Sequence, residues 1–258
     1  MAEIDLVFDP DNFVGGNITD PNRFFPLVQG NEWVYEEVDG LIVTESVTGE
    51  TKNILGVNCT VVTVTEREDG RLLERTKDYY AQDVAGNVWY LGEDSRARLE
   101  DGGWTTEGTW RAGVDDAVPG IIMLANPQIG DMYDQEGAIG VAEDRAEVLS
   151  LTESVTVPFG SFANCLLTED INPLTGDIER KFLAPDIGLV LTQGITEGGA
   201  EELVSFTTKD KGTVNLQSLV QSMASFGKQS GISPTLAPNG RDDPGLQAML
   251  TAGHDGRA

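Results

Sequence analysis

Short segments in which apolar and polar residues alternate recur along most of the chain, separated by residues that favour turns. The first group comprises residues 31–36, 41–47, 57–66, 72–81 and 87–92. A second group comprises residues 155–162, 166–169, 179–183, 188–192 and 203–206. Successive side chains of a strand point to opposite faces of a sheet, so this alternation predicts half-buried strands. Their spacing of about ten residues predicts a mainly β fold, built as an antiparallel meander.

The hairpin expected at residues 78–94 is the best-specified part of this meander. Its arms contain Tyr79-Tyr80 and the run Val88–Leu91. Gly86-Asn87 lies between the arms, and both residue types tolerate the positive φ that closes a tight turn. Aromatic side chains at this density cannot all face water. We therefore expect this hairpin to lie in the middle of the sheet, with one face on a core.

The composition predicts one β-rich body with a tail at each end. Residues 1–23 form an extended N-terminal segment rich in Asp, Asn, Pro and Gly, residues 24–208 form the β domain, and residues 209–258 form a C-terminal segment. Apolar residues of the last segment recur at helical spacing, which predicts one short helix that ends at Gly227 and is followed by an extended tail. These residues are Leu216, Leu219, Val220, Met223 and Phe226.

Both tails are too poor in large apolar residues to fold alone. Either the chain's own β domain holds them, or another copy of the chain does. In the second case the tails lie across a neighbouring sheet or add to its edge, which predicts self-association. The apolar stripe of the C-terminal helix would supply one contact, and Phe8 and Phe13 would supply the other.

The chain is strongly acidic, with 43 acidic residues, 17 basic residues and a formal net charge of −26. Such a charge repels nucleic acids and anionic membranes and favours cations. No apolar run is long enough to span a membrane. A possible Ca²⁺ loop contains Asp9, Asp11 and Asn17, but it lacks the glutamate that an EF-hand has at its twelfth position. The alternative is a plain loop rich in Asp and Asn.

The cysteine and histidine content limits the chemistry that the chain can perform. Cys59 and Cys165 lie in separate apolar segments, and they form either a disulfide or two unrelated buried thiols. The single histidine, His254, lies four residues from the C-terminus. Histidine-based triads, histidine-ligated zinc and histidine general bases are therefore excluded from the β domain.

Four stretches resemble an uncharacterised group of bacterial β-rich proteins that are often exported. They are FFPLVQGNEWVYE, DYYAQDVAGNVWYLGED, VTVPFGSFANCLLTED and KFLAPDIGLV, and the resemblance extends over about residues 24–206. It implies a sheet curled into an open or closed barrel and an extracellular or periplasmic location, and it implies no activity. No signal peptide opens the chain, and its start at Met1 fits either removal of such a peptide or a cytoplasmic start.

Two sets of residues are candidates for a site, and each has a structural alternative. Aromatic side chains of a barrel line a cavity for an apolar ligand or simply fill a core. They are Trp33, Tyr35, Tyr80, Trp89 and Tyr90, with Trp104 and Trp110 further along the chain. The acidic residues Asp78, Asp83, Glu93 and Asp94 bracket the hairpin, where they form a carboxylate pair or, as we expect, a solvated rim.

The sequence contains no catalytic constellation, so we expect a non-catalytic exported β protein that has a structural role or binds a small apolar ligand. The alternative is an enzyme without a catalytic histidine that uses Asp or Glu and Tyr in an aromatic-lined barrel. A cavity with a buried carboxylate of raised pKa favours the enzyme, whereas a filled interior favours the structural protein.

Overall fold

The computed structural model describes residues 2–13, 18–209 and 212–213. All of these residues belong to one unit, Met1–Val214. The helix and tail that the sequence predicts after residue 213 lie outside the described residues.

Nearly all regular structure of this unit is β-strand, with one short 3-10 helix near its start. In chain order the elements are β1 (Ala2–Glu3), η1 (Pro10–Asn12), β2 (Glu32–Glu37), β3 (Ile42–Ile54), β4 (Val57–Glu68), β5 (Arg71–Gln82), β6 (Val88–Arg98), β7 (Trp104–Thr105), β8 (Trp110–Arg111), β9 (Gly120–Met123), β10 (Asp131–Asp134), β11 (Arg145–Val157), β12 (Gly160–Ile171), β13 (Ile178–Ala184), β14 (Gly188–Gly194), β15 (Ala200–Thr208) and β16 (Gly212–Thr213).

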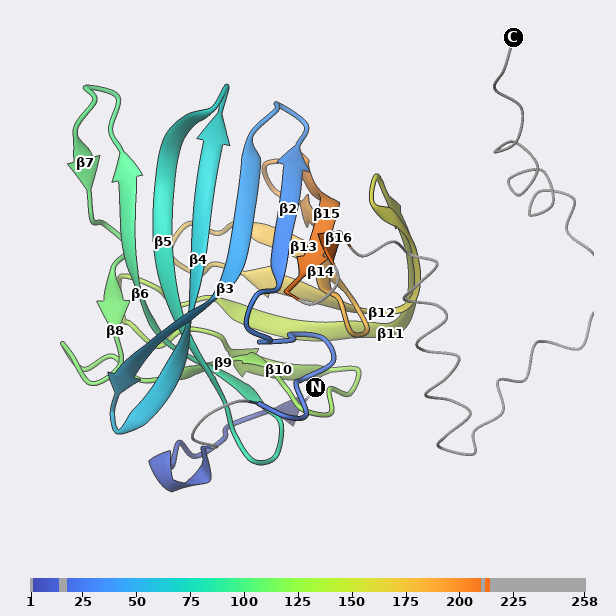
Figure 1. The fold of residues 1–258 in the computed structure, drawn as a ribbon. Helices are drawn as coiled ribbons and strands as arrows, with labels where there is room; N and C mark the ends of the chain where they lie inside the picture. The colour runs from blue at the N-terminus through green and yellow to red at the C-terminus, as the bar shows by residue number, and fades with distance from the viewer. Residues whose placement is uncertain (1, 14–17, 210–211, 214–258) are drawn as a thin grey trace, which may run out of the picture. The chain divides into compact units, whose positions relative to one another are not determined.

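The strands form one sheet in two arrays that each follow chain order. β2 to β6 lie side by side, and so do β10 to β15 (Figure 1). β2 pairs with β15, and this pairing joins the two arrays. Neighbouring strands are antiparallel, except that β1 and β10 are parallel. The prediction of a mainly β, antiparallel meander is confirmed.

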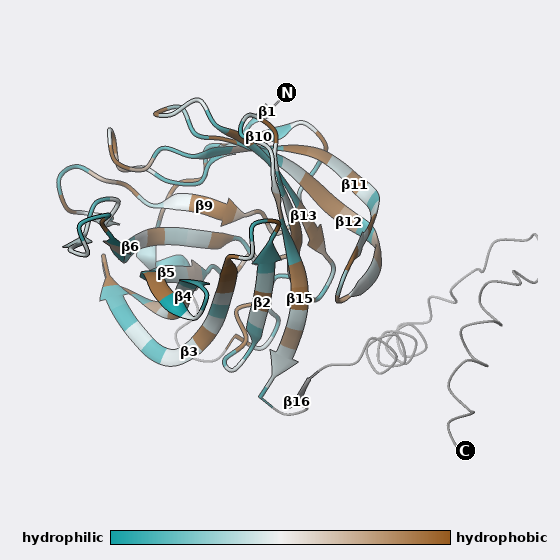
Figure 2. Cartoon of the chain, turned by 90° about the horizontal axis from the view of Figure 1, so that it is seen from above, coloured by the Kyte–Doolittle hydropathy of each residue, from teal (hydrophilic) through white to brown (hydrophobic). Residues whose placement is uncertain are grey.

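The sheet curls round but stays open. β9 pairs with β6 and comes close to β10, which lies near the opposite end of the strand order (Figure 2). An isolated bridge between Val118 and Gly137 links these two parts of the sheet, and no continuous ladder does so within the described residues. A side chain at Gly120 would collide with the backbone carbonyl of Gln135, so glycine permits this close approach.

The hairpin at residues 78–94 is not in the middle of the sheet, so that expectation was wrong. It consists of the ends of β5 and β6 that meet at the turn, and β6 lies close to one end of the strand order. Its aromatic residues are nevertheless buried, because the free edge of β6 pairs in turn with β9, β8 and β7. Three short strands thus give β6 the neighbours that a central position would have supplied.

Both faces of β4 are buried near Val61 and Val62. Val61 and Val62 are consecutive on β4 and therefore point to opposite faces, yet their exposed fractions are 2% and 5%. The register between β3 and β4 shifts after Val47. Beyond this shift the tip of the hairpin folds over β5 and β6, and Leu55 at the tip lies against Gly113 (Figure 1). The unit therefore has an inner core within the curl and a second core on the outer face of these strands.

The N-terminal segment packs on this outer face of its own chain. The rings of Phe8 and Phe13 lie 5.5 and 6.0 Å from the ring of Trp89, measured between centroids. Phe13 also forms a β-bridge with Asp83. The two phenylalanines that were candidates for contact with another copy thus contact their own β domain. Self-association through the tails stays a prediction.

Candidate functional site

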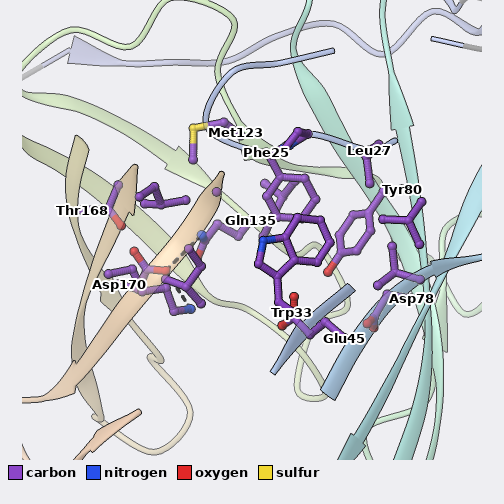
Figure 3. A pocket seen from close by; sticks show the side chains of 18 of the residues that line it. Phe25, Leu27, Trp33, Glu45, Asp78, Tyr80, Met123, Gln135, Thr168 and Asp170 are labelled. Atoms are coloured by element: carbon purple, nitrogen blue, oxygen red, sulfur yellow. Dashed lines mark hydrogen bonds and ion pairs between the residues drawn. The ribbon is translucent and has the colours of Figure 1, made fainter. Parts of the chain in front are cut away.

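A cavity of about 160 Å³ lies inside the curled sheet, between the two arrays. We call it the inner cavity. Its apolar lining comes from Phe25, Pro26, Leu27, Trp33, Tyr35, Val47, Val62, Tyr80, Ile122, Met123, Leu183, Gly188 and Leu189, and its polar lining from Glu45, Asp78, Tyr133, Gln135, Thr168, Asp170 and Lys181. Figure 3 shows Phe25, Leu27 and Met123 at one end of this cavity and Glu45 at the other.

The aromatic side chains of β2 are fixed by hydrogen bonds to β14 and the turn before it. Trp33 and Tyr35 are two residues apart on the strand and share its inner face. The Trp33 Nε1 donates to the carbonyl oxygen of Ile187 at 2.8 Å, and the Tyr35 hydroxyl donates to that of Leu189 at 3.2 Å. Trp33 also stacks on Phe206 of β15, with 5.2 Å between ring centroids. These contacts hold the rings at the cavity wall.

Asn22 anchors the segment that covers the apolar end of the cavity. Its Nδ2 donates to the carbonyl oxygens of Gly86 and Leu124, and its Oδ1 accepts from the backbone N–H groups of Phe24 and Phe25. The Phe25 ring then lies edge-on to Tyr80, with 5.0 Å between centroids. The motif at residues 24–27 therefore closes one end of the inner cavity.

The wall opposite Tyr80 contains an ion pair whose carboxylate is buried. Lys181 Nζ lies 2.9 Å from Asp170 Oδ2, which also accepts from Gln135 Nε2 at 3.1 Å. The other oxygen of this carboxylate, Oδ1, has no hydrogen-bond partner among the described residues, and neither has the hydroxyl of Tyr133. Both side chains line the cavity, with exposed fractions of 4% for Asp170 and 1% for Tyr133. Unpaired polar groups at such burial are costly, so this wall has capacity for a polar partner.

Asp78 and Glu93 meet at the hydroxyl of Tyr90. The hydroxyl oxygen lies 2.8 Å from Asp78 Oδ1 and 2.8 Å from Glu93 Oε2. A phenol has one hydrogen to donate, so both contacts are hydrogen bonds only when one carboxyl is protonated and donates in turn. Burial raises the pKa of Asp78, and burial together with the charge of Asp78 raises the pKa of Glu93. The inner cavity therefore borders a carboxyl pair that retains a proton well above the usual pH range of such groups.

A wider cleft of about 480 Å³ adjoins the inner cavity and shares Glu45, Lys181 and Leu189 with it. We call it the outer cleft. Its charged lining consists of Glu37, Glu45, Asp177, Glu179, Lys181, Glu197 and Glu201. Burial raises the pKa of Glu45 to about 7. Burial and the nearby carboxylates, first Glu45, raise the pKa of Glu201 to about 8. The cleft concentrates negative charge against a single lysine.

Three of the five predicted ligand-binding aromatics, Trp33, Tyr35 and Tyr80, line the inner cavity. Tyr90 stacks on Tyr80 with 4.6 Å between centroids and forms the layer behind the wall. Trp89 lies on the outer face, where its Nε1 donates to Asp83 Oδ2 at 3.0 Å. Since consecutive strand residues point to opposite faces, Trp89 and Tyr90 could not both have faced one cavity.

Of the acidic residues that were expected to form a solvated rim, Asp78 and Asp83 are buried, whereas the Asp94 side chain is 45% exposed and pairs with Arg111. Asp78 and Asp83 are 5% and 8% exposed. Asp83 Oδ1 accepts from the backbone N–H groups of Ala85 and Asn87, so this residue shapes the turn. Sequence reasoning also gave no role to Glu45, Lys181, Asp170 or Tyr133. For Glu45 a signal was present, because it occupies an inward position between Val43 and Val47 on the same face of β3.

The disulfide alternative was wrong: Cys59 and Cys165 are both free and fully buried. Cys59 lies on β4 and Cys165 on β12, and β13, β14, β15, β2 and β3 separate these strands in the sheet order. Cys59 points to the face of β4 opposite to that of Val62, which lines the inner cavity, so its thiol points away from the interior across which β4 could meet β12. The reading as two unrelated thiols holds.

The possible Ca²⁺ loop gains no support from the described residues. Asp9 caps the short 3-10 helix, and its Oδ1 accepts from the Asp11 backbone N–H at 3.0 Å. Asn17 lies outside the described residues. Across residues 2–13, 18–209 and 212–213, no three acidic, cysteine or histidine side chains are grouped so that they could hold a metal ion. Calcium binding stays a prediction.

Comparisons with known proteins do not assign this chain to a family. No known family and no curated protein matches it. One similar solved structure is from Bacteroides fragilis and is described as an exported protein with a YmcC-like fold; it is 16% identical, covers 72% of this chain and 100% of its own, and has a TM-score of 0.40. Another solved structure is described as a lipoprotein of Parabacteroides distasonis. It is 14% identical to this chain, the match covers 73% of this chain and 100% of the lipoprotein, and the TM-score is 0.39.

Similarity at these scores is too low to assign a fold or a function to this chain. The descriptions as exported protein and lipoprotein concern those two proteins. Among the described residues there is also no helix with the length and apolar character needed to cross a bilayer.

Proposed function

We propose that this chain is a non-catalytic exported protein that binds a small, mainly apolar ligand in the inner cavity. The supporting observation is an aromatic-lined space of about 160 Å³ inside the curled sheet. A buried apolar cavity of about 150 Å³ can accommodate a benzene-sized molecule. The ligand group inside the cavity is therefore about one ring or a short branched chain in size. The proposal of export rests on the acidic composition and on the resemblance to exported β-rich proteins.

A cavity-filling variant tests the binding proposal. We expect toluene, titrated into ¹⁵N-labelled protein, to shift amide resonances around the inner cavity in a saturable manner. Val62→Phe places a ring in the cavity and should abolish these shifts without loss of the folded spectrum, because space for the ring exists. Thr63→Phe on the same strand points to the other face and is the matched control, so it should retain binding.

The proposal fails if toluene causes no saturable shifts in the parent, or if Val62→Phe and the parent bind it equally. An ordinary melting curve for Val62→Phe is needed beside the titration, since an unfolded variant would lose binding for a different reason. A more conservative filling variant, Val62→Leu, should then reduce the affinity in a folded protein.

Acid–base catalysis is a second candidate function, favoured by the Asp78–Tyr90–Glu93 arrangement. Asp78 lines the inner cavity, and its shared proton would make it a general acid for a substrate bound there. In a panel of nitrophenyl esters and glycosides, we expect this function to appear as turnover that Asp78→Asn removes. Equal rates for the parent and Asp78→Asn, with toluene binding intact in both, would leave the binding function and reject the enzyme.

A further inference from the structure

Acidic side chains far outnumber basic ones in the lining of the outer cleft. Six of the seven charged side chains in its lining are acidic. The one cation of this lining, Lys181, is engaged by Asp170 at 2.9 Å and by Glu179 at 3.8 Å. Glu37, Glu45 and Glu201 form no ion pair with any described residue. A cation placed between them would therefore remove an unfavourable arrangement of like charges.

The outer cleft adjoins the inner cavity, whose lining is mainly aromatic and aliphatic. Glu45 borders both the outer cleft and the inner cavity, whose other walls are the rings of Trp33, Tyr35 and Tyr80. The unpaired Tyr133 hydroxyl and Asp170 Oδ1 belong to side chains of the same cavity lining, and each residue is more than nine-tenths buried. Asp170 Oδ1 is an acceptor without a donor, so this lining, like that of the outer cleft, favours a ligand that donates hydrogen bonds over an anion.

We propose that the ligand is a small organic cation, whose apolar group lies in the inner cavity and whose protonated amine lies beside Glu45 and Glu201 in the outer cleft. This inference rests on the proposed binding function and specifies its ligand class. A bare metal ion fits less well, because no metal-binding group of side chains is present in the described residues and the aromatic walls would have no role. Aromatic faces favour organic ammonium ions, and the surplus of carboxylates disfavours anions.

Two probes that differ in charge and share the same ring test the inference. Isothermal titration at pH 8 compares benzylamine, which is cationic, with benzyl alcohol, which is neutral. We expect benzylamine to bind at least about tenfold more tightly, the order of preference that one partly buried carboxylate contact provides. Glu201→Gln and Glu45→Gln should each reduce this preference. Glu202→Gln is the matched control, because it removes the same charge from the next residue of β15, which points to the other face. This variant should keep the parent's preference for benzylamine.

Each outcome separates this inference from the proposed function. If both probes bind the parent equally, or if benzyl alcohol binds more tightly, the cation inference is overturned and the binding function stands. If neither probe binds, water alone occupies the cavity and the binding function fails with it. Benzylamine binding that survives Val62→Phe undiminished would show association with surface charge only, which also overturns the inference.

Discussion

Replacement of Trp33 by alanine is expected to lower the free energy of unfolding by about 3–5 kcal/mol, as for other large buried aromatics. Trp33 is 5% exposed, stacks on Phe206 and donates to the Ile187 carbonyl. Truncation would remove these contacts and enlarge the adjoining inner cavity. Because the indole connects β2 both to the turn before β14 and to β15 through these groups, nearby side chains cannot collapse into the void without moving the sheet.

Urea denaturation followed by far-ultraviolet circular dichroism measures this effect. Trp104→Ala is the matched control, since that indole is 44% exposed and contacts Arg98 at the surface. Trp104→Ala should lower the free energy of unfolding by less than about 1 kcal/mol. Trp33→Phe retains a ring but leaves the Ile187 carbonyl without its donor, so we expect its free energy of unfolding to lie between those of the parent and Trp33→Ala. If Trp33→Ala and Trp104→Ala unfold at the same urea concentration, Trp33 does not belong to the core.

The second large effect is a loss of stability as the pH rises from about 4 to about 8. Buried carboxyls of this protein have higher pKa values when folded than when unfolded, so the folded state binds more protons in this range. Burial raises the pKa values of Glu45 and Glu136 to about 7, and burial with neighbouring charge raises the pKa of Glu201 to about 8. The pKa values of Asp78 and Glu93 are raised in the same direction.

The sign follows from which state releases its protons first. These carboxyl groups ionise near pH 4 in the unfolded chain and near pH 7 to 8 in the folded protein. Stability is therefore highest below about pH 4 and declines as the pH rises from about 4 to about 8. A tenfold difference in proton affinity between the folded and unfolded states corresponds to about 1.4 kcal/mol for a fully buried group. Solvent reduces the contribution of half-buried groups such as Glu45 and Glu201. We expect a total decline of roughly 2–4 kcal/mol.

Chemical denaturation at several pH values between 4.5 and 8.5 measures the decline. Asp78→Asn keeps a hydrogen-bonding side chain beside Tyr90 but removes one buried ionisation, so it should flatten the profile and increase stability at pH 8. Asp5→Asn changes the net charge by the same amount at an exposed position and should leave the slope unchanged. Stability that increases steadily from pH 5 to pH 8 would contradict the prediction.

The strands were predictable from the sequence because each depends on local alternation and local turns. The hairpin turn at Asp83–Asn87 illustrates this, since Gly86 has a φ of +96° and Asp83 accepts the turn's backbone N–H groups. The two-residue period of the strands, carried through this turn, also separates the aromatic residues by face. It places Tyr79 and Trp89 on one face and Tyr80 and Tyr90 on the other, which separates the outer core from the cavity wall.

The site itself was less predictable, because it joins residues that are distant in the chain. Glu45 and Glu201 come from β3 and β15, and they share one cleft only because β2 pairs with both strands. Asp78 resembles any charged residue of a hairpin until the cavity beside it is known. Alternation along a strand shows that a polar residue points inward, but it does not show which polar residues from other strands lie nearby.

The pairing of β2 with β15 has a consequence for how the chain folds. Tyr35 lies in register with Leu203, so residues from near the two ends of the β domain's sequence must meet. The arrays β3–β6 and β11–β14 can assemble from neighbouring hairpins while the chain is still being synthesised, but this seam has to wait until β15 has been made. Non-local pairings of this kind slow folding and leave sheet edges open to aggregation in the meantime. Since Trp33 reaches Phe206 only across the β2–β15 pairing, the inner cavity is complete only after this pairing has formed, and a ligand that fills the cavity would stabilise only chains in which these strands are paired.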